Sequence, residues 1–581
     1  MRMRLIVLVL GAVALVAAGC GSSKKSSTSG STSSSPVKGK KGGTLTVLAA
    51  SDVDSLDPGY WYYQYDQQAL AEPTQRSLMG WEADKKQPTP DLASAEPVLS
   101  DGDKTYTFKL KPGIKYAPGP VKHTVKAADI KYAMERCFLP QVGNGYANSY
   151  YRYIVGVDAY KAGKAKEITG IQAPDDTTLI IKQTKPYGAL TQALALPCTT
   201  PVPKEYAAKY DQGKQSTYGQ HQVFTGPYMI KGAESGSMSA GYTPGKKIDL
   251  VRNPNWDATT DFKPAYLDHI IFLGGNDLAL ASRKILTGSG YMSGDFAAPP
   301  TDILKSALQS RKDQLHILEA GSVRYIALNN AVPPFNDPNI RKAVLAGTDK
   351  NALRITRGGP TIGSIATNFI PKDIPGGSAA KATASALDYN KNPNGDMAVA
   401  AKYFKAAGFK DGKYHGPRIL MVGDNQPPAS KTGEAFQQML KNMGFDVNYR
   451  QVPHDVMISK FCGTPKSKVN VCPNMGWGKD FFEPISIIDP VFNGGNIVPS
   501  GNVNIAQQND PALNKQMDAA AFVTDPAQRY SAWGKIDGEL MQHAVSIPWL
   551  WDNDINFASK DVNLVQNEFN ASGDVTYSSL K

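Results

Sequence analysis

The side chains best suited to covalent chemistry follow no catalytic spacing in this sequence. The seven histidines are scattered singly, at His123, His221, His269, His316, His415, His454 and His543. The H-E-x-x-H pair of zinc proteases, the G-x-S-x-G elbow of serine hydrolases and the G-K-[ST] phosphate loop do not occur. We therefore expect no enzyme activity, no metal and no cofactor. A secreted hydrolase is the rival interpretation, because a catalytic triad is spatial and can join residues distant in sequence.

One cysteine, Cys20, stands at the end of an export signal. Arg2 and Arg4 precede an unbroken apolar run, residues 5–18, which is too short to span a bilayer comfortably. The run ends in Ala-Ala-Gly-Cys, which resembles a bacterial lipobox, with Ala17 where leucine is more usual. We expect residues 1–19 to be a signal peptide and Cys20 to carry lipid. An ordinary cleaved signal followed by an unmodified cysteine is the alternative.

Residues 20–43 are expected to form a flexible, lipid-anchored spacer. They are almost wholly Ser, Thr, Gly and Lys, a composition that buries too little apolar surface to fold. A coil of this kind has a root-mean-square reach of roughly 25 Å. Removing the two signal arginines and the five spacer lysines from the net charge of +11 leaves +4 on the rest of the chain. No cluster of basic residues remains there, so we exclude nucleic-acid binding.

The four remaining cysteines predict disulfides, because an even number in an exported protein is typical of them. We favour Cys462 with Cys472, which lie close together in a turn-rich loop, and this leaves Cys137 with Cys198. Two buried free thiols are the alternative for the second pair, since Cys137 falls on the apolar side of a predicted helix. Neither pair has the spacing of a metal site.

Apolar periodicity predicts a mixed α/β body. The roughly 540 mature residues exceed what one hydrophobic core supports, so two or three domains are expected. The clearest unit is a strand at 418–423, a helix striped by Phe436 and Leu440, and a second strand at 445–449. Such a βαβ unit places its two strands parallel, with a right-handed crossover.

Other helices are predicted from capping residues at their N-termini and from apolar residues at helical spacing. Asp337-Pro338 offers an N-cap followed by proline at the first helical position, and Asp510-Pro511 and Asp525-Pro526 repeat this device. After Thr124, an apolar stripe that includes Ile130 and Met134 predicts an amphipathic helix. A helix striped by Met397 and Phe404 is expected to cover the same sheet as the βαβ unit.

Seven short segments recur in one order, at residues 42–58, 90–93, 106–113, 127–136, 225–228, 252–256 and 340–344. Each is weak alone, but together they resemble the family 5 extracellular solute-binding proteins of ABC importers, the group of the oligopeptide- and dipeptide-binding proteins. The resemblance covers nearly everything from Gly42 to the C-terminus.

The resemblance implies an α/β, two-lobed periplasmic-binding-protein-like (type II) fold with an extra domain inserted in the N-terminal lobe. Mapped onto this chain, it places lobe I at residues 44–85, 220–318 and 546–581, the inserted domain at 86–219, and lobe II at 319–545. A lobe assembled from separated segments requires at least two hinge crossings. These would let the lobes close as rigid bodies around a ligand.

The resemblance also implies a ligand-binding segment at residues 475–484, Met-Gly-Trp-Gly-Lys-Asp-Phe-Phe-Glu-Pro. In peptide-binding relatives a Gly-Trp segment of this form carries an aspartate that pairs with the α-ammonium of the peptide. Asp480 occupies the matching position here, four residues after Gly476. A charge-assisted hydrogen bond of this kind is about twice as strong as a neutral one. An aspartate that caps a turn or faces solvent is the alternative.

Aromatic and basic residues complete the candidate site. Tyr62 and Tyr63 belong to an aromatic run at 60–65 that is denser than one buried face needs, so we expect some of its rings to line the ligand cleft. Trp477 could offer the ligand a flat apolar face, with core packing as the alternative. Arg324 could pair with a ligand carboxylate, with a structural ion pair as the alternative.

We interpret the chain as a monomeric, lipid-anchored protein on the extracytoplasmic face of the cell membrane. It would capture a solute, foremost a short peptide, and deliver it to the permease subunits of an ABC importer. Affinity for the termini and backbone, which all peptides share, would tolerate varied side chains. The alternatives are a non-peptide ligand, such as an oligosaccharide or metal chelate, and a peptide-sensing receptor.

Overall fold

A computed structural model describes residues 39–295 and 298–581 of the chain. The predicted signal peptide, Cys20 and most of the predicted spacer lie outside the described residues. Within the two described ranges, no helix combines the length and the apolar character that crossing a membrane requires.

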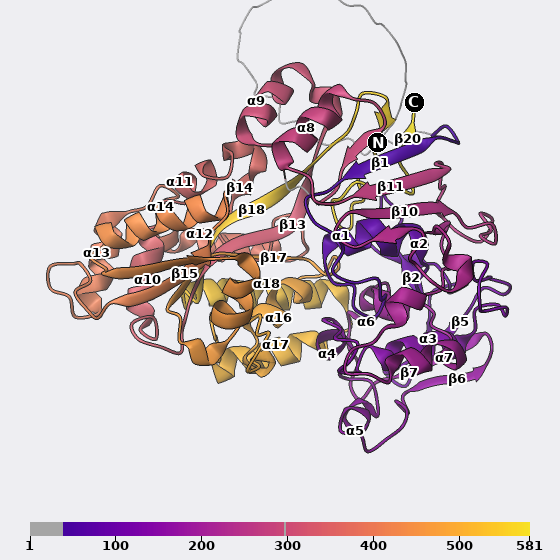
Figure 1. Ribbon diagram of the computed structural model, residues 1–581. Helices are drawn as coiled ribbons and strands as arrows, with labels where there is room; N and C mark the ends of the chain where they lie inside the picture. Colours follow the sequence, from indigo (N-terminus) through magenta and orange to yellow (C-terminus); the bar gives the residue numbers. More distant parts are fainter. Residues whose placement is uncertain (1–38, 296–297) are drawn as a thin grey trace, which may run out of the picture. The chain divides into compact units, whose positions relative to one another are not determined.

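A six-stranded sheet is assembled from segments far apart in sequence (Figure 1). Its strands are β1 (Thr44–Leu48), β8 (Tyr228–Ile230), β9 (Tyr242–Thr243), β10 (Lys247–Arg252), β11 (His269–Leu273) and β12 (Tyr291–Ser293). β1 pairs in parallel with β11 and β12, and β10 continues the sheet antiparallel to β11. Leu45 and Val47 are fully buried on one face of β1, as strand alternation requires.

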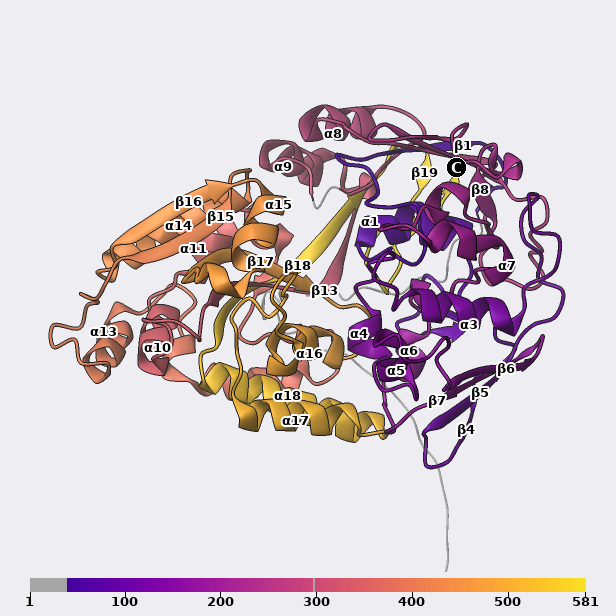
Figure 2. The same ribbon diagram turned by 60° about the horizontal axis from the view of Figure 1, so that its bottom comes forward.

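A second six-stranded sheet has the order β14-β18-β13-β17-β15-β16. Its strands are β13 (Leu315–Leu328), β14 (Gly363–Ile365), β15 (Ile419–Asp424), β16 (Val447–Val452), β17 (Val471–Gly478) and β18 (Ser546–Phe557). The predicted βαβ unit is confirmed within it: β15 and β16 pair in parallel, and α14 (Ala429–Asn442) lies against them (Figure 2). Phe436 and Leu440 of α14 are fully buried.

Two long strands, β13 and β18, connect the two sheets (Figure 1). They pair antiparallel along the second sheet, and a bridge from Met292 of β12 to Ala558 ties the end of β18 to the first sheet. The pairing shifts between Glu319 and Val323, around Gly321 with its φ of +63°. This positive φ favours glycine, and a side chain there would also displace the end of the Lys479 side chain, whose Nζ would lie 2.6 Å from the added Cβ. The predicted lobe boundaries at 319 and 546 fall within β13 and at the first residue of β18.

A four-stranded antiparallel sheet occupies the segment predicted as the inserted domain. Its strands are β4 (Val98–Ser100), β5 (Thr105–Lys109), β7 (Thr178–Lys182) and β6 (Ile171–Asp175). The amphipathic helix predicted after Thr124 is α3 (Ala127–Arg136), which packs on β6 and β7 with Ile130 and Met134 fully buried. Two short hairpin pairs, β2 with β3 (Met79–Gly80, Thr89–Pro90) and β19 with β20 (Val562–Asn563, Ser579–Leu580), complete the strands.

The three predicted Asp-Pro helix starts are confirmed. Asp337 caps α10 (Pro338–Ala346), Asp510 caps α17 (Pro511–Ala521) and Asp525 caps α18 (Pro526–Gln542), each accepting a backbone N–H of the first turn. The helix expected over the βαβ sheet, α13 (Met397–Ala406), differs in its neighbour: it packs mainly against α10, and Met397 is 45% exposed. Phe404 reaches toward the unit, with its ring centroid 5.9 Å from that of Phe445.

The four cysteines of the body form two disulfides in the structure. Cys137, which follows α3, is bonded to Cys198, and Cys462 is bonded to Cys472 at the start of β17. The first bond links the end of α3 to the short 3-10 helix Pro197–Thr199, and the second links β17 to the end of the π-helix Met457–Cys462.

Candidate functional site

The aromatic run at 60–65 follows a loop that the 86–219 segment holds in place. Arg136 of α3 donates to Asp57 through Nη2 at 2.8 Å and to Asp211 through Nε at 2.7 Å. Further along, Asn144 donates to the Gly59 carbonyl at 2.6 Å, and Tyr146 donates to the Tyr62 carbonyl at 2.8 Å. These bonds fix where Tyr62 enters the site.

Asp480 lies two residues beyond β17 and is half-buried. Its Oδ2 accepts a hydrogen bond from Tyr150, the last residue of α4 (Ala147–Tyr150). Burial raises the pKa of Asp480 to about 7, although the hydrogen bond from Tyr150 opposes the shift. Asp480 is therefore a carboxyl group whose ionisation is finely balanced at neutral pH.

Tyrosine rings surround this carboxyl group. The Tyr62 and Tyr146 ring centroids are 4.7 Å apart, and the Tyr150 and Phe481 centroids are also 4.7 Å apart. The charge of Asp480 contributes to raising the pKa values of Tyr62, Tyr146 and Tyr150, after burial, which contributes most. Phe481 itself is fully buried, so it supports Tyr150 rather than facing a ligand.

No basic side chain of the described residues lies within 4.0 Å of the Asp480 carboxylate. Its neighbour Lys479 points elsewhere: Nζ donates to the Ala320 carbonyl at 2.8 Å. Burial lowers the pKa of Lys479 to about 8. A half-buried carboxylate without a cation partner is costly unless a ligand supplies the charge.

Gly476 and Trp477, on β17, both contact other parts of the protein. Gly476 pairs with Arg324 across the β13–β17 ladder, and a Cβ there would lie 3.1 Å from Arg324 Nη1. The glycine thus leaves room for the arginine side chain. Trp477 is half-buried and donates its indole N–H to the Ser486 carbonyl at 2.7 Å. Its ring packs partly against the core, which was the stated alternative to a ligand contact.

Arg324 forms an ion pair with Asp552 of β18, with Nε 3.0 Å from Oδ2. Beside this pair lies Arg357, whose Nε is buried and has no hydrogen-bond partner among the described residues. Burial, reinforced by the charge of Arg324, lowers the pKa of Arg357 to about 9, and Asp552 opposes the shift. Both guanidinium groups are therefore influenced by the Asp552 carboxylate, but only Arg324 is ion-paired with it, and the buried Nε of Arg357 is left without a hydrogen-bond partner among the described residues.

A third half-buried carboxyl group belongs to Asp554 of β18. Its Oδ2 accepts a hydrogen bond from Gln64 Nε2 at 2.9 Å. Burial raises its pKa to about 6, with smaller opposing effects from Gln64, Lys479 and Arg324. Gln64 follows Tyr63, whose side chain is 59% exposed. The ring of Tyr63 meets that of Tyr62 edge-on, with the two centroids 5.6 Å apart.

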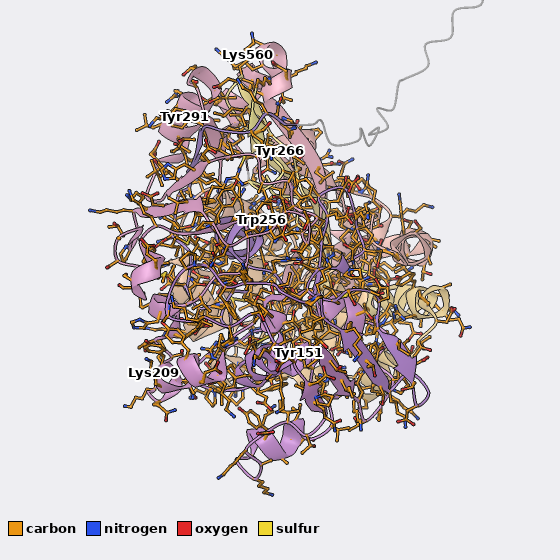
Figure 3. The ribbon with its side chains drawn as sticks, turned by 90° about the vertical axis from the view of Figure 1, so that its right-hand side faces the viewer. Tyr151, Lys209, Trp256, Tyr266, Tyr291 and Lys560 are labelled. Atoms are coloured by element: carbon orange, nitrogen blue, oxygen red, sulfur yellow. A yellow bond between two sulfur atoms is a disulfide. The ribbon has the colours of Figure 1, made fainter. Side chains whose placement is uncertain are left out.

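Of the predicted residues, the structure brings Asp480 and Tyr62 together, and it places Gly476 against Arg324 in a separate contact. Sequence reasoning missed Tyr146, Tyr150 and Arg357. The tyrosines lie in the run Tyr-Ala-Asn-Ser-Tyr-Tyr, whose aromatic density was a usable signal. The next residue, Tyr151 (labelled in Figure 3), points into the 86–219 segment and donates to the Ala193 carbonyl at 2.6 Å. Only Tyr150 turns toward Asp480.

Two hollows in the surface lie outside this group of residues. A groove of about 630 Å³ runs between α17 and α18, and a pocket of about 480 Å³ is lined by Arg152, Lys185 and Phe522, among others. Neither is lined by a predicted site residue. The candidate site is therefore defined by its uncompensated charges and by the rings around Asp480.

Comparison with known proteins gives a consistent result. The family described as bacterial extracellular solute-binding proteins, family 5 Middle, matches residues 87–498. The chain is 25% identical over 514 residues to the oligopeptide-binding protein OppA of Bacillus subtilis, covering 86% of each protein. It is 24% identical over 519 residues to the periplasmic oligopeptide-binding protein OppA of Escherichia coli, covering 87% of this chain and 86% of that protein.

Solved structures share the fold. The clavulanic acid biosynthesis oligopeptide binding protein 2 superposes with a TM-score of 0.80 at 24% identity, covering 93% of this chain and 96% of that one. Listeria monocytogenes OppA bound to peptide superposes with a TM-score of 0.70 at 20% identity, covering 94% of this chain and 100% of that one. These likenesses confirm the predicted α/β, two-lobed type II binding-protein fold.

Proposed function

Because the chain belongs to the family 5 bacterial extracellular solute-binding proteins, which is not a family of enzymes, we propose that it captures a short peptide and delivers it to an ABC importer. The observation that carries the peptide assignment is Asp480, a half-buried carboxyl group among tyrosine rings with no basic partner in the described chain. The likeness to oligopeptide-binding proteins supports the same ligand class.

The amino terminus of the peptide would complete the Asp480 site. An α-ammonium group donates charge-assisted hydrogen bonds to the carboxylate, which are about twice as strong as neutral ones. The negative faces of nearby tyrosine rings favour a cation by about 0.5–2 kcal/mol. Tyr150 already donates to Oδ2, so it holds the carboxylate in place before the ligand arrives.

The carboxyl terminus or an acidic side chain of the peptide would find its partner at Arg357. The planar guanidinium group suits a carboxylate, and this one has a buried N–H with no partner in the part of the chain that the structure describes. Arg324 is already paired with Asp552, so Arg357 is the better placed of the two to meet a ligand carboxylate. Amidating the peptide carboxylate should weaken its binding to the native chain, and it should weaken binding to the Arg357→Gln variant by a smaller factor.

Capture and delivery would involve no change in any covalent bond. Closure of two lobes around the β13–β18 connection would enclose the peptide, and the closed form would dock on the importer permease. Cys20 would anchor the protein to the outer face of the cell membrane, where the spacer lets the body reach the permease. Fractionation of cells that carry Cys20→Ala tests the anchor: the protein should leave the membrane fraction.

The charge on Asp480 is tested by Asp480→Asn, which keeps the size and shape of the side chain. Native mass spectrometry first identifies the co-purified peptide, which is then synthesised with a free and an acetylated amino terminus. Calorimetry should show that the variant binds the free-amine form roughly 10- to 150-fold more weakly, since a hydrogen bond to a charged group contributes about 1.5–3 kcal/mol. Its affinity for the acetylated form should stay within about twofold of the native value.

Two outcomes would contradict the proposal. Equal losses for the free and acetylated peptides would show that Asp480 does not read the amine. Co-purification of an oligosaccharide or a metal chelate, with binding insensitive to Asp480→Asn, would favour a non-peptide ligand held by aromatic stacking.

A further inference from the structure

A second group of ionisable side chains lies in the 86–219 segment, and none of its members belongs to the peptide site. We propose that His123, Asp129 and Glu205 bind a divalent transition-metal ion, for which Zn²⁺ is the probe. One ring nitrogen of His123 and one carboxylate oxygen from each of the other two residues all lie within 4.8 Å of one another. Imidazole nitrogen and carboxylate oxygen are ligands that Zn²⁺ takes at about 2.0–2.2 Å, so one ion can contact all three after small side-chain movements.

His123 and Asp129 are oriented by hydrogen bonds at polar atoms that would not contact the ion. His123 Nδ1 lies 2.8 Å from the Thr124 carbonyl, to which it donates, and this tautomer leaves the lone pair on Nε2. Asp129 Oδ2 accepts from Tyr116 Oη at 2.8 Å and from the Lys126 backbone N–H at 3.0 Å. Its Oδ1 has no hydrogen-bond donor among the described residues. Supporting bonds of this kind orient the ligands of protein metal sites.

The charges of the group are also unbalanced. Glu205 Oε1 lies 2.6 Å from His123 Nε2, and no lysine or arginine of the described chain lies within 4.0 Å of Asp129 or Glu205. A protonated His123 paired with Glu205 is the simplest alternative, but it leaves one negative charge uncompensated. A divalent ion would balance both carboxylates.

Glu205 is the ligand that must move to admit an ion. Two ligand atoms on one Zn²⁺ are roughly 3 Å apart or more, so Glu205 must move away from His123 slightly. It is exposed on the short helix α7 (Lys204–Ala207), just before Lys209, which is labelled in Figure 3. A bound ion would tie α7 to the first turn of α3 and to the bridge between Lys115 and Thr124. Sequence spacing gave no sign of this site, because Glu205 is remote from the other two ligands along the chain.

The test is calorimetric titration of the full chain, stripped of metal with a chelator, with ZnCl₂ at neutral pH. One Zn²⁺ should bind per chain and raise the melting temperature. His123→Ala and Glu205→Gln should each lower the affinity at least tenfold while leaving the melting temperature of the metal-free protein unchanged within error. Tyr116→Phe, which removes the donor to Asp129, should lower the affinity about 10-fold.

His415→Ala is the matched control. His415 also lies 2.6 Å from a carboxylate, that of Asp411, and both side chains are exposed. Its loss should not change the Zn²⁺ affinity. The proposal is overturned if the native chain binds no stoichiometric Zn²⁺, or if the binding that is seen survives both His123→Ala and Glu205→Gln. Binding that His415→Ala abolishes would place the metal elsewhere and overturn it too.

Discussion

The Asp480 carboxyl group changes its ionisation close to neutral pH, because burial raises its pKa to about 7. A bound ammonium group favours the ionised form, so peptide binding should lower this pKa and release protons. Above pH 7 the carboxylate is already ionised, whereas below it the ligand must first displace a proton. The peptide amine must also be protonated, and its ordinary pKa is about 8. Affinity for free-amine peptides should therefore be greatest between about pH 7 and 8, where both groups are largely charged, and decline as the pH falls through about 7.

The variant Tyr150→Phe tests the same linkage with a defined sign. The Tyr150 hydroxyl stabilises the ionised form of Asp480, so its removal should raise the pKa of that carboxyl group further. The midpoint of the affinity–pH curve, measured by calorimetry, should shift to higher pH. Tyr151→Phe is the control, since Tyr151 donates to the Ala193 carbonyl and not to Asp480. A midpoint unchanged by Tyr150→Phe would argue against Asp480 as the titrating group.

At the scale of single elements, α14 shows how burial of an apolar stripe stabilises the fold. Phe436 and Leu440 are fully buried where the helix lies on β15 and β16, while Gln438 is exposed. Gly444, just beyond the helix, has a φ of +99°, a conformation that favours glycine at a helix C-terminus. The unit is therefore specified by local signals that agree with one another.

Truncation of that stripe should be costly. Phe436→Ala is expected to lower the free energy of unfolding by about 3–5 kcal/mol, because it removes buried apolar contact and leaves a cavity. Gln438→Ala on the exposed side of the same helix should change it by less than about 0.5 kcal/mol. Chemical denaturation followed by circular dichroism measures both. Similar values for the two variants would mean that α14 does not pack as described.

At the scale of the whole molecule, contacts join the 86–219 segment to the residues that follow β17. Besides the Tyr150–Asp480 bond, Arg152 donates to Asn496 through Nη1 at 2.8 Å, and its Nη2 lies 3.4 Å from Asp489 Oδ2. These contacts span two parts that are far apart in sequence, and they accompany the arrangement in which Asp480 is half-buried. They should therefore favour the closed form even without ligand.

Removal of this link should shift the molecule toward an open form. Arg152→Ala is expected to increase the radius of gyration of the peptide-free protein in solution scattering. It should also lower peptide affinity, because part of the binding energy must then drive closure. Saturating peptide should restore the native radius. Lys164→Ala, on the exposed surface of the same segment, is the control. An unchanged radius and affinity in Arg152→Ala would show that these bonds do not influence closure.

Local signals in the sequence were sufficient for many individual elements. The Asp-Pro caps, the α3 stripe and the βαβ unit depend on residues within a few turns of one another, and all of them are confirmed. The family resemblance extended this to the fold class, because several weak segments in one order constrain the whole chain. The domain boundaries and the ligand roles of single residues stay predictions.

The sequence by itself therefore determined the class of protein, its main helices and strands, and a short segment in which to look for the ligand. Only the tertiary structure decided which charges are compensated. Strands and loops distant in sequence are brought together, so Asp480 meets Tyr150 and Arg324 meets Asp552. The same arrangement leaves Arg357 with an N–H that no other described residue accepts. The burial and pairing of a charged group determine its pKa and the ligand charge that it favours. Both depend on residues distant in sequence, so no periodic pattern along the chain indicates them.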